Sequence, residues 1–210
     1  YIYNKVMKGI RKLYLVLILL VVSTLQMMAQ QKIENPYDFN GTDQYLDTGI
    51  KLWTGQPFTL MLVFTSRAVD NGANQTIFTT RNHGSEHGVT FSQLTGSAFE
   101  RCSMIGKSGY TPSTVFDDSV YGVRRGLVLT SNGNRVTYSK IVTSNDAYTY
   151  RIPSSISLPS FHTDETLLLG ANRIASGIGE FWNGKINAMR IDNRELGANE
   201  KYNFFIAQGL

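Results

Sequence analysis

The sequence predicts an all-β protein: one sandwich of two antiparallel sheets with a short C-terminal helix, preceded by an N-terminal signal peptide. Three observations lead to this prediction. The first 29 residues are basic and then apolar, the rest consists of short alternating segments between Gly, Asn, Asp and Ser clusters, and helical periodicity appears only near the end. Residues 1–29 are therefore assigned to the signal peptide and its upstream residues, and residues 30–210 to one sandwich domain.

The N-terminal segment has the layout of a signal peptide. Basic residues precede an unbroken apolar run over residues 13–22, which is shorter than the roughly 20 apolar residues of a membrane span. We expect cleavage after Ala29, export to the periplasm, cell surface or medium, and no membrane attachment afterwards. An uncleaved N-terminal anchor is the alternative, because Met27 is bulkier than the small residue preferred near a cleavage site.

The charge balance argues against a nucleic-acid or anionic-membrane partner. The chain carries 20 basic and 16 acidic residues, and four of the basic ones lie in the signal segment: Lys5, Lys8, Arg11 and Lys12. The mature domain is therefore electrically balanced, without the basic excess that such partners require. Cys102 is the single cysteine, so no intrachain disulfide can form.

The strands follow from alternation and from the turn residues between them. In residues 58–65 both alternating faces are apolar, which predicts a central strand covered on both sides. Asn132 and Gly133 tolerate positive φ, so they predict a hairpin between two strands. Further strands are predicted over residues 44–48, 76–80, 88–93, 99–104, 122–130, 135–141, 148–152, 166–169 and 185–192.

The C-terminal part departs from simple alternation. Ile186 is followed by the next inward residue, Met189, after three positions rather than two, which predicts a β-bulge near Asn187 and Ala188. Beyond this strand, residues 196–207 predict one short helix. The residues of this helix that we expect to face the sandwich are Tyr202, Phe205 and Ile206.

Two blocks of sequence, one near each end of the domain, share a family pattern. The first covers residues 37–49 (YDFNGTDQYLDTG) and 57–60 (PFTL), and the second covers residues 167–172, 181–186, 189–191 and 193–196, with Glu200 beyond. They resemble the opening and closing strands of the laminin G-like, concanavalin A-like lectin/glucanase jelly rolls of the secreted bacterial type. The resemblance extends over about residues 33–206 and implies a jelly-roll sandwich. We also expect Gly41 and Gly184 at tight backbone turns and Trp182 in the packing.

The acidic residues do not support glycosidase chemistry. This fold hosts glycosidases, sugar-binding modules, adhesion domains and structural spacers, so function must be argued from the site. Glucanase members carry a Glu-x-Asp-x-x-Glu-like cluster on one strand, and this chain has no such cluster. Asp117 and Asp118 are adjacent, as are Asp164 and Glu165, so on a strand each pair would point to opposite faces. We therefore predict no catalytic residues and no enzymatic activity.

Residues 83–87 (HGSEH) spell the inverted zinc-protease motif. That motif requires a helix, which places both histidines on one face. Gly84, Ser85 and Gly88 disfavour a helix, and predicted strands lie on both sides of the segment. A loop that is solvated or contacts a ligand is the preferred interpretation. A loop metal ion and a metalloprotease are the weaker alternatives.

Oxygen ligands for calcium are abundant in the loops. By resemblance to laminin G-like domains, a structural calcium ion is implied at the rim, with Asp43, Asp47 and Asp70 as candidate ligands. Their spacing matches no dedicated calcium loop, and Asx turns and strand-end caps are the simpler interpretation. No cofactor is expected to be required.

Sugar recognition combines an aromatic face with a few amide or charged groups. The candidate residues for such contacts are Trp53, Arg81, Asn82, His83 and Tyr110. We predict a secreted or cell-surface carbohydrate-binding, lectin-like module whose partner is a glycan or an extracellular protein. A protein-interaction, adhesion or structural jelly-roll domain is the alternative, and a glycoside hydrolase is a distant third.

Overall fold

The computed structural model describes most of residues 30–210. The described residues are 14, 30–33, 35–52, 55–68, 74–81, 88–93, 100–105, 113–116, 121–133, 135–142, 150–151, 156–157 and 165–210. The predicted signal peptide therefore lies outside the described residues, except for Tyr14. Across the part that the structure describes, no helix has the length and apolar character needed to cross a membrane.

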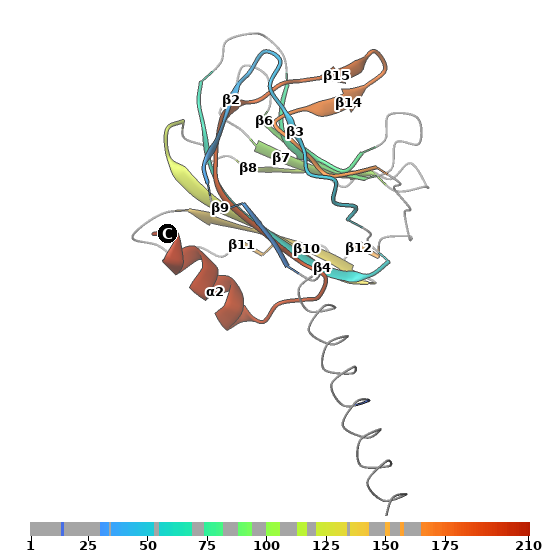
Figure 1. Cartoon of the computed structure of the whole chain (residues 1–210), viewed down its shortest axis with the longest axis vertical. Coiled ribbons are helices and arrows are strands. Elements are labelled where there is room, and N and C mark those ends of the chain that lie inside the picture. The colour runs from blue at the N-terminus through green and yellow to red at the C-terminus, as the bar shows by residue number, and fades with distance from the viewer. Residues whose placement is uncertain are drawn as a thin grey trace, which may run out of the picture.

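Two antiparallel sheets form a sandwich (Figure 1). In pairing order, sheet A contains β1 (Gln30–Ile33), β16 (Asn183–Asp192), β4 (Pro57–Ser66), β9 (Arg124–Asn132), β10 (Arg135–Val142) and β11 (Tyr150–Arg151). In addition, β2 (Tyr37–Asn40) pairs with β16, and β12 (Ile156–Ser157) pairs with β10. Sheet B contains β3 (Leu46–Asp47), β13 (Leu168–Leu169), β5 (Gln75–Thr79), β6 (Gly88–Gln93), β7 (Glu100–Ile105) and β8 (Ser113–Phe116).

Two smaller elements lie on opposite sides of this sandwich. A hairpin of β14 (Asn172–Ile174) and β15 (Gly177–Gly179) stands over sheet B, while α2 (Ala198–Ala207) lies on the outer side of sheet A (Figure 1). This arrangement confirms the predicted jelly-roll sandwich of two antiparallel sheets with a C-terminal helix.

The central strand is β4, which is buried on both faces as predicted. It lies between β16 and β9 in sheet A. One face joins the core between the two sheets through Phe58, Leu60, Leu62 and Phe64. The other face carries Met61 and Val63, which cluster with Phe205 of α2. Removing both faces from water is the main contribution of this strand to stability.

Trp182 lies in the core, as predicted, and explains a nearby glycine. It is 0% exposed, and its ring centroid lies 5.6 Å from that of Phe39 and 6.3 Å from that of Phe64. Gly41 adopts φ 74 and confirms its predicted turn. The turn predicted at Gly184 is wrong, because this residue lies inside β16 without a positive φ. A Cβ on Gly184 would lie 2.1 Å from Cζ2 of Trp182, so the glycine makes room for the indole ring.

Two local predictions along sheet A are confirmed. The register between β16 and β4 shifts between Ile186 and Ala188, which places the bulge where the phase of the apolar residues indicated. Strands β9 and β10 form the predicted hairpin, in which Ser131 pairs with Val136 and Gly133 adopts φ 89.

The C-terminal helix is confirmed, but two of the three residues predicted to face the sandwich point away from it. Phe205 is 2% exposed, whereas Tyr202 is 61% and Ile206 is 51% exposed. Phe204 takes part in the contact with the sheet instead, so the buried face is rotated relative to the prediction. The segment before the helix sets this rotation, because its buried residue Leu196 joins the same cluster.

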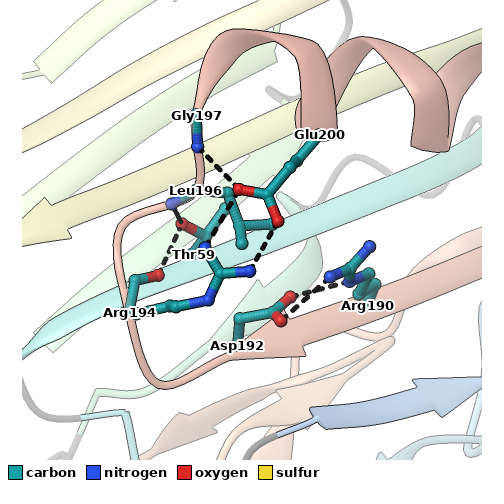
Figure 2. A network of polar contacts seen from close by, with 7 residues as sticks. All are labelled: Thr59, Arg190, Asp192, Arg194, Leu196, Gly197 and Glu200. Carbon is teal, nitrogen blue, oxygen red and sulfur yellow. Dashed lines mark hydrogen bonds and ion pairs between the residues drawn. The ribbon is translucent and has the colours of Figure 1, made fainter.

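Polar contacts fix this segment to the centre of sheet A (Figure 2). The Thr59 hydroxyl donates to the carbonyl of Arg194 at 2.9 Å and accepts from the backbone N–H of Leu196 at 3.0 Å. The Glu200 carboxylate accepts two hydrogen bonds from Arg194, at 3.0 and 2.5 Å, and one from the N–H of Gly197 at 3.1 Å. The last contact satisfies a free donor at the start of α2.

Candidate functional site

The outward side chains of sheet B form one polar face. Leu46, Leu169, Phe78 and Phe91 pack in the core between the sheets. Because side chains alternate along a strand, their neighbours point to the opposite side, which we call the outer face of sheet B. Among the described residues of β3, β13, β5 and β6 and their ends, this face carries Tyr45, Asp47, Thr166, Leu168, Thr76, Thr79, Arg81, Thr90 and Ser92. A bulge in β5 interrupts the alternation, so Ile77 joins Phe78 in the core.

The centre of this face is a floor of hydroxyl groups. Thr79 and Thr90 share a hydrogen bond of 2.9 Å between their side chains, and Thr76 and Ser92 share one of 3.1 Å. All four residues are at most 8% exposed. Neighbouring hydroxyls satisfy one another here, so the floor can be buried without the cost of unpaired polar groups. A ligand would meet the rim of the face rather than this floor.

A charged cluster around Arg173 forms one edge of the face. Nε of Arg173 lies 3.1 Å from a carboxylate oxygen of Glu165, while the two terminal nitrogens donate to the Thr166 hydroxyl at 3.0 Å and to the carbonyl of Arg81 at 3.4 Å. The pKa of Asp47 is lowered chiefly by a hydrogen bond from Thr166, so this carboxylate is ionised at neutral pH. The cluster forms because β3 ends, β13 begins and β5 ends at the same edge of the antiparallel sheet.

The Glu180 carboxylate connects the β14–β15 hairpin region to the hydroxyl floor. One carboxylate oxygen accepts hydrogen bonds from the Thr76 hydroxyl at 3.1 Å and from the Asn172 amide at 2.7 Å. Glu180 adopts φ 51, the one positive φ at a described residue other than glycine. Such a conformation costs energy and persists where surrounding contacts enforce it. Asn172 is 4% exposed, and its amide oxygen has no hydrogen-bond partner.

Tyr45 provides an aromatic side chain at the β3 side of the face. It is 42% exposed, and its ring centroid lies 6.4 Å from that of Phe181 at an interplanar angle of 38°. The preceding loop is held by the Asn40 side-chain oxygen, which accepts from the backbone N–H groups of residues 42, 43 and 44 at 2.9, 3.2 and 3.3 Å. These contacts fix the backbone up to Gln44, the residue before Tyr45.

The structure brings together two of the residues singled out from the sequence. Arg81 and Asp47 both lie at the Arg173 edge, connected through Thr166 and Arg173. Asp43 instead accepts from the Asn40 amide at 2.8 Å within its own loop. The remaining candidates, Trp53, Asn82, His83, Tyr110 and Asp70, lie outside the described residues, as does the rest of the 83–87 motif. Within the described ranges, no three His, Cys, Asp or Glu residues gather as a metal site would require.

Several residues of the face were not singled out from the sequence. Tyr45 carried a usable signal, because it and Asp47 flank the inward Leu46 and must therefore share the outer face. Arg173, Asn172 and Glu180 carried none, because they belong to a short hairpin whose position over sheet B depends on contacts distant in the chain.

Comparisons with known proteins agree with this architecture. No family model matches the chain, and no curated protein does so either. The NanB sialidase of Streptococcus pneumoniae aligns with 81% of this chain and 27% of its own, at 16% identity and a TM-score of 0.60. The Ruminococcus gnavus IT-sialidase CBM40 bound to alpha2,3 sialyllactose aligns with 83% of this chain and 97% of its own, at 11% identity and a TM-score of 0.57. The botulinum neurotoxin serotype G binding domain aligns with 86% of this chain and 45% of its own, at 12% sequence identity and a TM-score of 0.58.

The chain shares a fold with these domains. At such low identities the likeness concerns the fold and does not extend to individual residues. The chain spans about a quarter of the length of the sialidase chain but nearly the whole of the separate CBM40 domain.

Proposed function

We propose that this protein is an exported carbohydrate-binding module that binds its glycan on the outer face of sheet B without hydrolysing it. The observation that carries the proposal is the gathering of Arg173, Asp47 and the backbone carbonyl of Arg81 at one rim of this face, with the exposed Tyr45 two residues before Asp47 in the chain. The similar fold of a domain whose structure contains sialyllactose supports it further.

The rim has the chemistry that sugar recognition needs. A sugar hydroxyl both donates and accepts, so it is best held between a guanidinium or amide donor and a carboxylate acceptor. Arg173 is held by Glu165 and Thr166, which limits the side-chain entropy lost when a ligand binds. An edge built from the ends of several strands can present such groups in a fixed geometry.

The absence of hydrolysis in this proposal rests on the acidic residues. The sequence has no spaced carboxylate cluster on one strand, and retaining or inverting chemistry needs two opposed carboxyl groups. Among the described carboxylates of the face, Glu165 pairs with Arg173, and Glu180 accepts from Thr76 and Asn172. We assign both to holding the site together. We expect no release of reducing sugar from β-glucans or galactans.

Export is the second part of the proposal. It rests on the predicted signal segment over residues 1–29. An exported lectin-like module has a glycan or an extracellular protein as its partner, and the site described here favours the glycan.

A glycan array probed with the exported protein tests the proposed function. We expect binding to a defined set of glycans both with calcium and with a chelator, since the proposal requires no cofactor. A structural calcium ion would show as a chelator-dependent fall in melting temperature. Failure to bind any glycan under either condition would contradict the proposal and favour the protein-interaction or structural alternative.

A variant at the centre of the charged edge localises the binding. Arg173→Gln keeps much of the side-chain volume but loses the charge, and we expect affinity for the array's best glycan to fall roughly tenfold. Arg67→Gln is the matched control, because Arg67 also pairs with an acid, Asp38, but lies at the end of β4 in sheet A. Equal affinities of both variants would show that the glycan binds elsewhere.

A further inference from the structure

The side chain of Tyr45 is exposed and held in place. Tyr45 is 42% exposed immediately before β3, and its ring centroid lies 6.4 Å from that of Phe181, with an angle of 38° between the ring planes. The Asn40 amide oxygen fixes the preceding loop through three backbone N–H groups. A ring oriented in this way before a ligand arrives loses little freedom on binding, which is what a stacking surface requires.

The surroundings of this ring are acidic. Asp43 and Asp47 stand two residues before and after Tyr45, and Asp47 shares its face of the strand. Two residues of chain span at most about 7 Å, which is within the screening length of about 8 Å in physiological salt. The low pKa of Asp47 keeps this carboxylate charged at neutral pH. At the described edge, Arg173 contributes to the low pKa of Asp47 and directs its donors to Glu165, the Thr166 hydroxyl and the backbone carbonyl of Arg81.

We infer that Tyr45 is the stacking platform of the glycan site and that it receives a neutral hexopyranose, rather than an acidic sugar. This inference rests on the proposed function and specifies its ligand class. A glucose or galactose ring has a face of C–H groups that packs against the π-electrons of an aromatic ring. A sugar carboxylate at the same position would meet the field of Asp43 and Asp47 instead.

This ligand class differs from the one seen in a domain of similar fold. The Ruminococcus gnavus domain was crystallised with sialyllactose, which carries an acidic sugar. We therefore expect Asp43 and Asp47 to make this protein prefer neutral sugars, although it shares its fold with a domain that binds sialyllactose.

Lactose, cellobiose and 3′-sialyllactose are suitable probes in calorimetric titrations of the exported protein. We expect lactose or cellobiose to bind about tenfold more tightly than 3′-sialyllactose. Tyr45→Ala should lower the affinity for the neutral disaccharide roughly tenfold, while Tyr45→Phe should retain it, since the ring remains. Tyr202→Ala is the matched control, because Tyr202 is an exposed tyrosine, 61% accessible, on α2 at the other side of the sandwich.

The outcomes distinguish this inference from the proposed function. If Tyr45→Ala binds a disaccharide with the same affinity as the wild type, Tyr45 is not the stacking platform, while the proposed function still stands. Preferential binding of 3′-sialyllactose would overturn the neutral ligand class. Absence of binding to all three probes and to every glycan of the array would overturn the proposed function, and the inference with it. Melting curves of each variant verify that the fold is retained.

Discussion

At the scale of single residues, Trp182 and Gly184 approach each other closely in the core. A tryptophan inside an apolar block is expected to be buried, and Trp182 is. The need for glycine at position 184 could not be read from the sequence, because it arises from the indole ring of Trp182, just before β16, lying against the backbone two residues further on. Composition predicts which residues enter a core, but close approaches arise only once the chain is folded.

Gly184→Ala should destabilise the protein by about 1–3 kcal/mol, because the added methyl group must displace the buried indole ring. Chemical denaturation measures this loss. Gly197→Ala is the control, since the nearest atom to a Cβ there is a Glu200 side-chain oxygen at 3.8 Å. It should cost less than about 1 kcal/mol. Equal losses of unfolding free energy in the two variants would show that the close approach of Gly184 to Trp182 does not affect stability.

The carboxylate of Glu200 makes part of the stability depend on pH. Hydrogen bonds from Arg194 and from the Gly197 N–H lower its pKa from 4.5 to about 2. A lowered folded-state pKa means that the stabilisation is present above about pH 4.5 and is lost as the pH falls towards 2. Glu200→Gln should therefore melt at a lower temperature than the wild type at pH 7, and the small difference should vanish by pH 2. A difference that stays constant over this range would exclude this role.

At the scale of elements, alternation of apolar residues was the most informative signal. It predicted residues 88–93 as a strand, and β6 has those bounds. It also located the bulge in β16. Apolar residues must keep pointing into the core along a buried face, so a change in their spacing reveals the extra residue. The hairpin β14–β15 was missed, since strands of three residues are too short to show a period.

Helix α2 shows the limit of periodicity for short elements. A pattern of Tyr202, Phe205 and Ile206 fits a helical face, but so does one built from Phe204 and Phe205. Which face of the helix is buried depends on contacts with residues distant in the chain. The Thr59 hydroxyl hydrogen-bonds to the carbonyl of Arg194 and to the N–H of Leu196, just before the helix. The sequence of the helix alone does not contain that information.

Truncations on α2 test the observed orientation. Phe205→Ala should cost about 3–5 kcal/mol, because it leaves a cavity against Met61 and Val63. Tyr202→Ala and Ile206→Ala should each cost no more than about 0.5 kcal/mol, because both side chains are more than half exposed. Denaturant unfolding of the three variants gives these values, and a large loss for Tyr202→Ala or Ile206→Ala would contradict the assigned face.

At the scale of the whole molecule, the candidate site is a product of topology. Asp47, Arg81, Thr166 and Arg173 come from separate parts of the chain and meet because β3, β13 and β5 are neighbours in sheet B. The sequence indicated Asp47 for calcium and Arg81 for a sugar, without placing them together. The order of strands in a sheet depends on long-range pairing, which local alternation does not encode.

The exported protein should begin at Gln30. This prediction follows from the apolar segment over residues 13–22 and the cleavage site expected after Ala29. N-terminal sequencing of the protein recovered outside the cytoplasm measures it. Recovery of a membrane-bound form that keeps the apolar segment would favour the uncleaved anchor.

The most direct test of a glycan site on sheet B is a map of the binding surface. Isotope-labelled protein over residues 30–210, titrated with the best glycan from the array, reports binding at each backbone amide by NMR. We expect the largest shifts at Tyr45, Asp47, Arg81 and Arg173, and none at the exposed residues of α2 on the opposite side of the sandwich. Shifts confined to α2, around Tyr202 and Ile206, would contradict it.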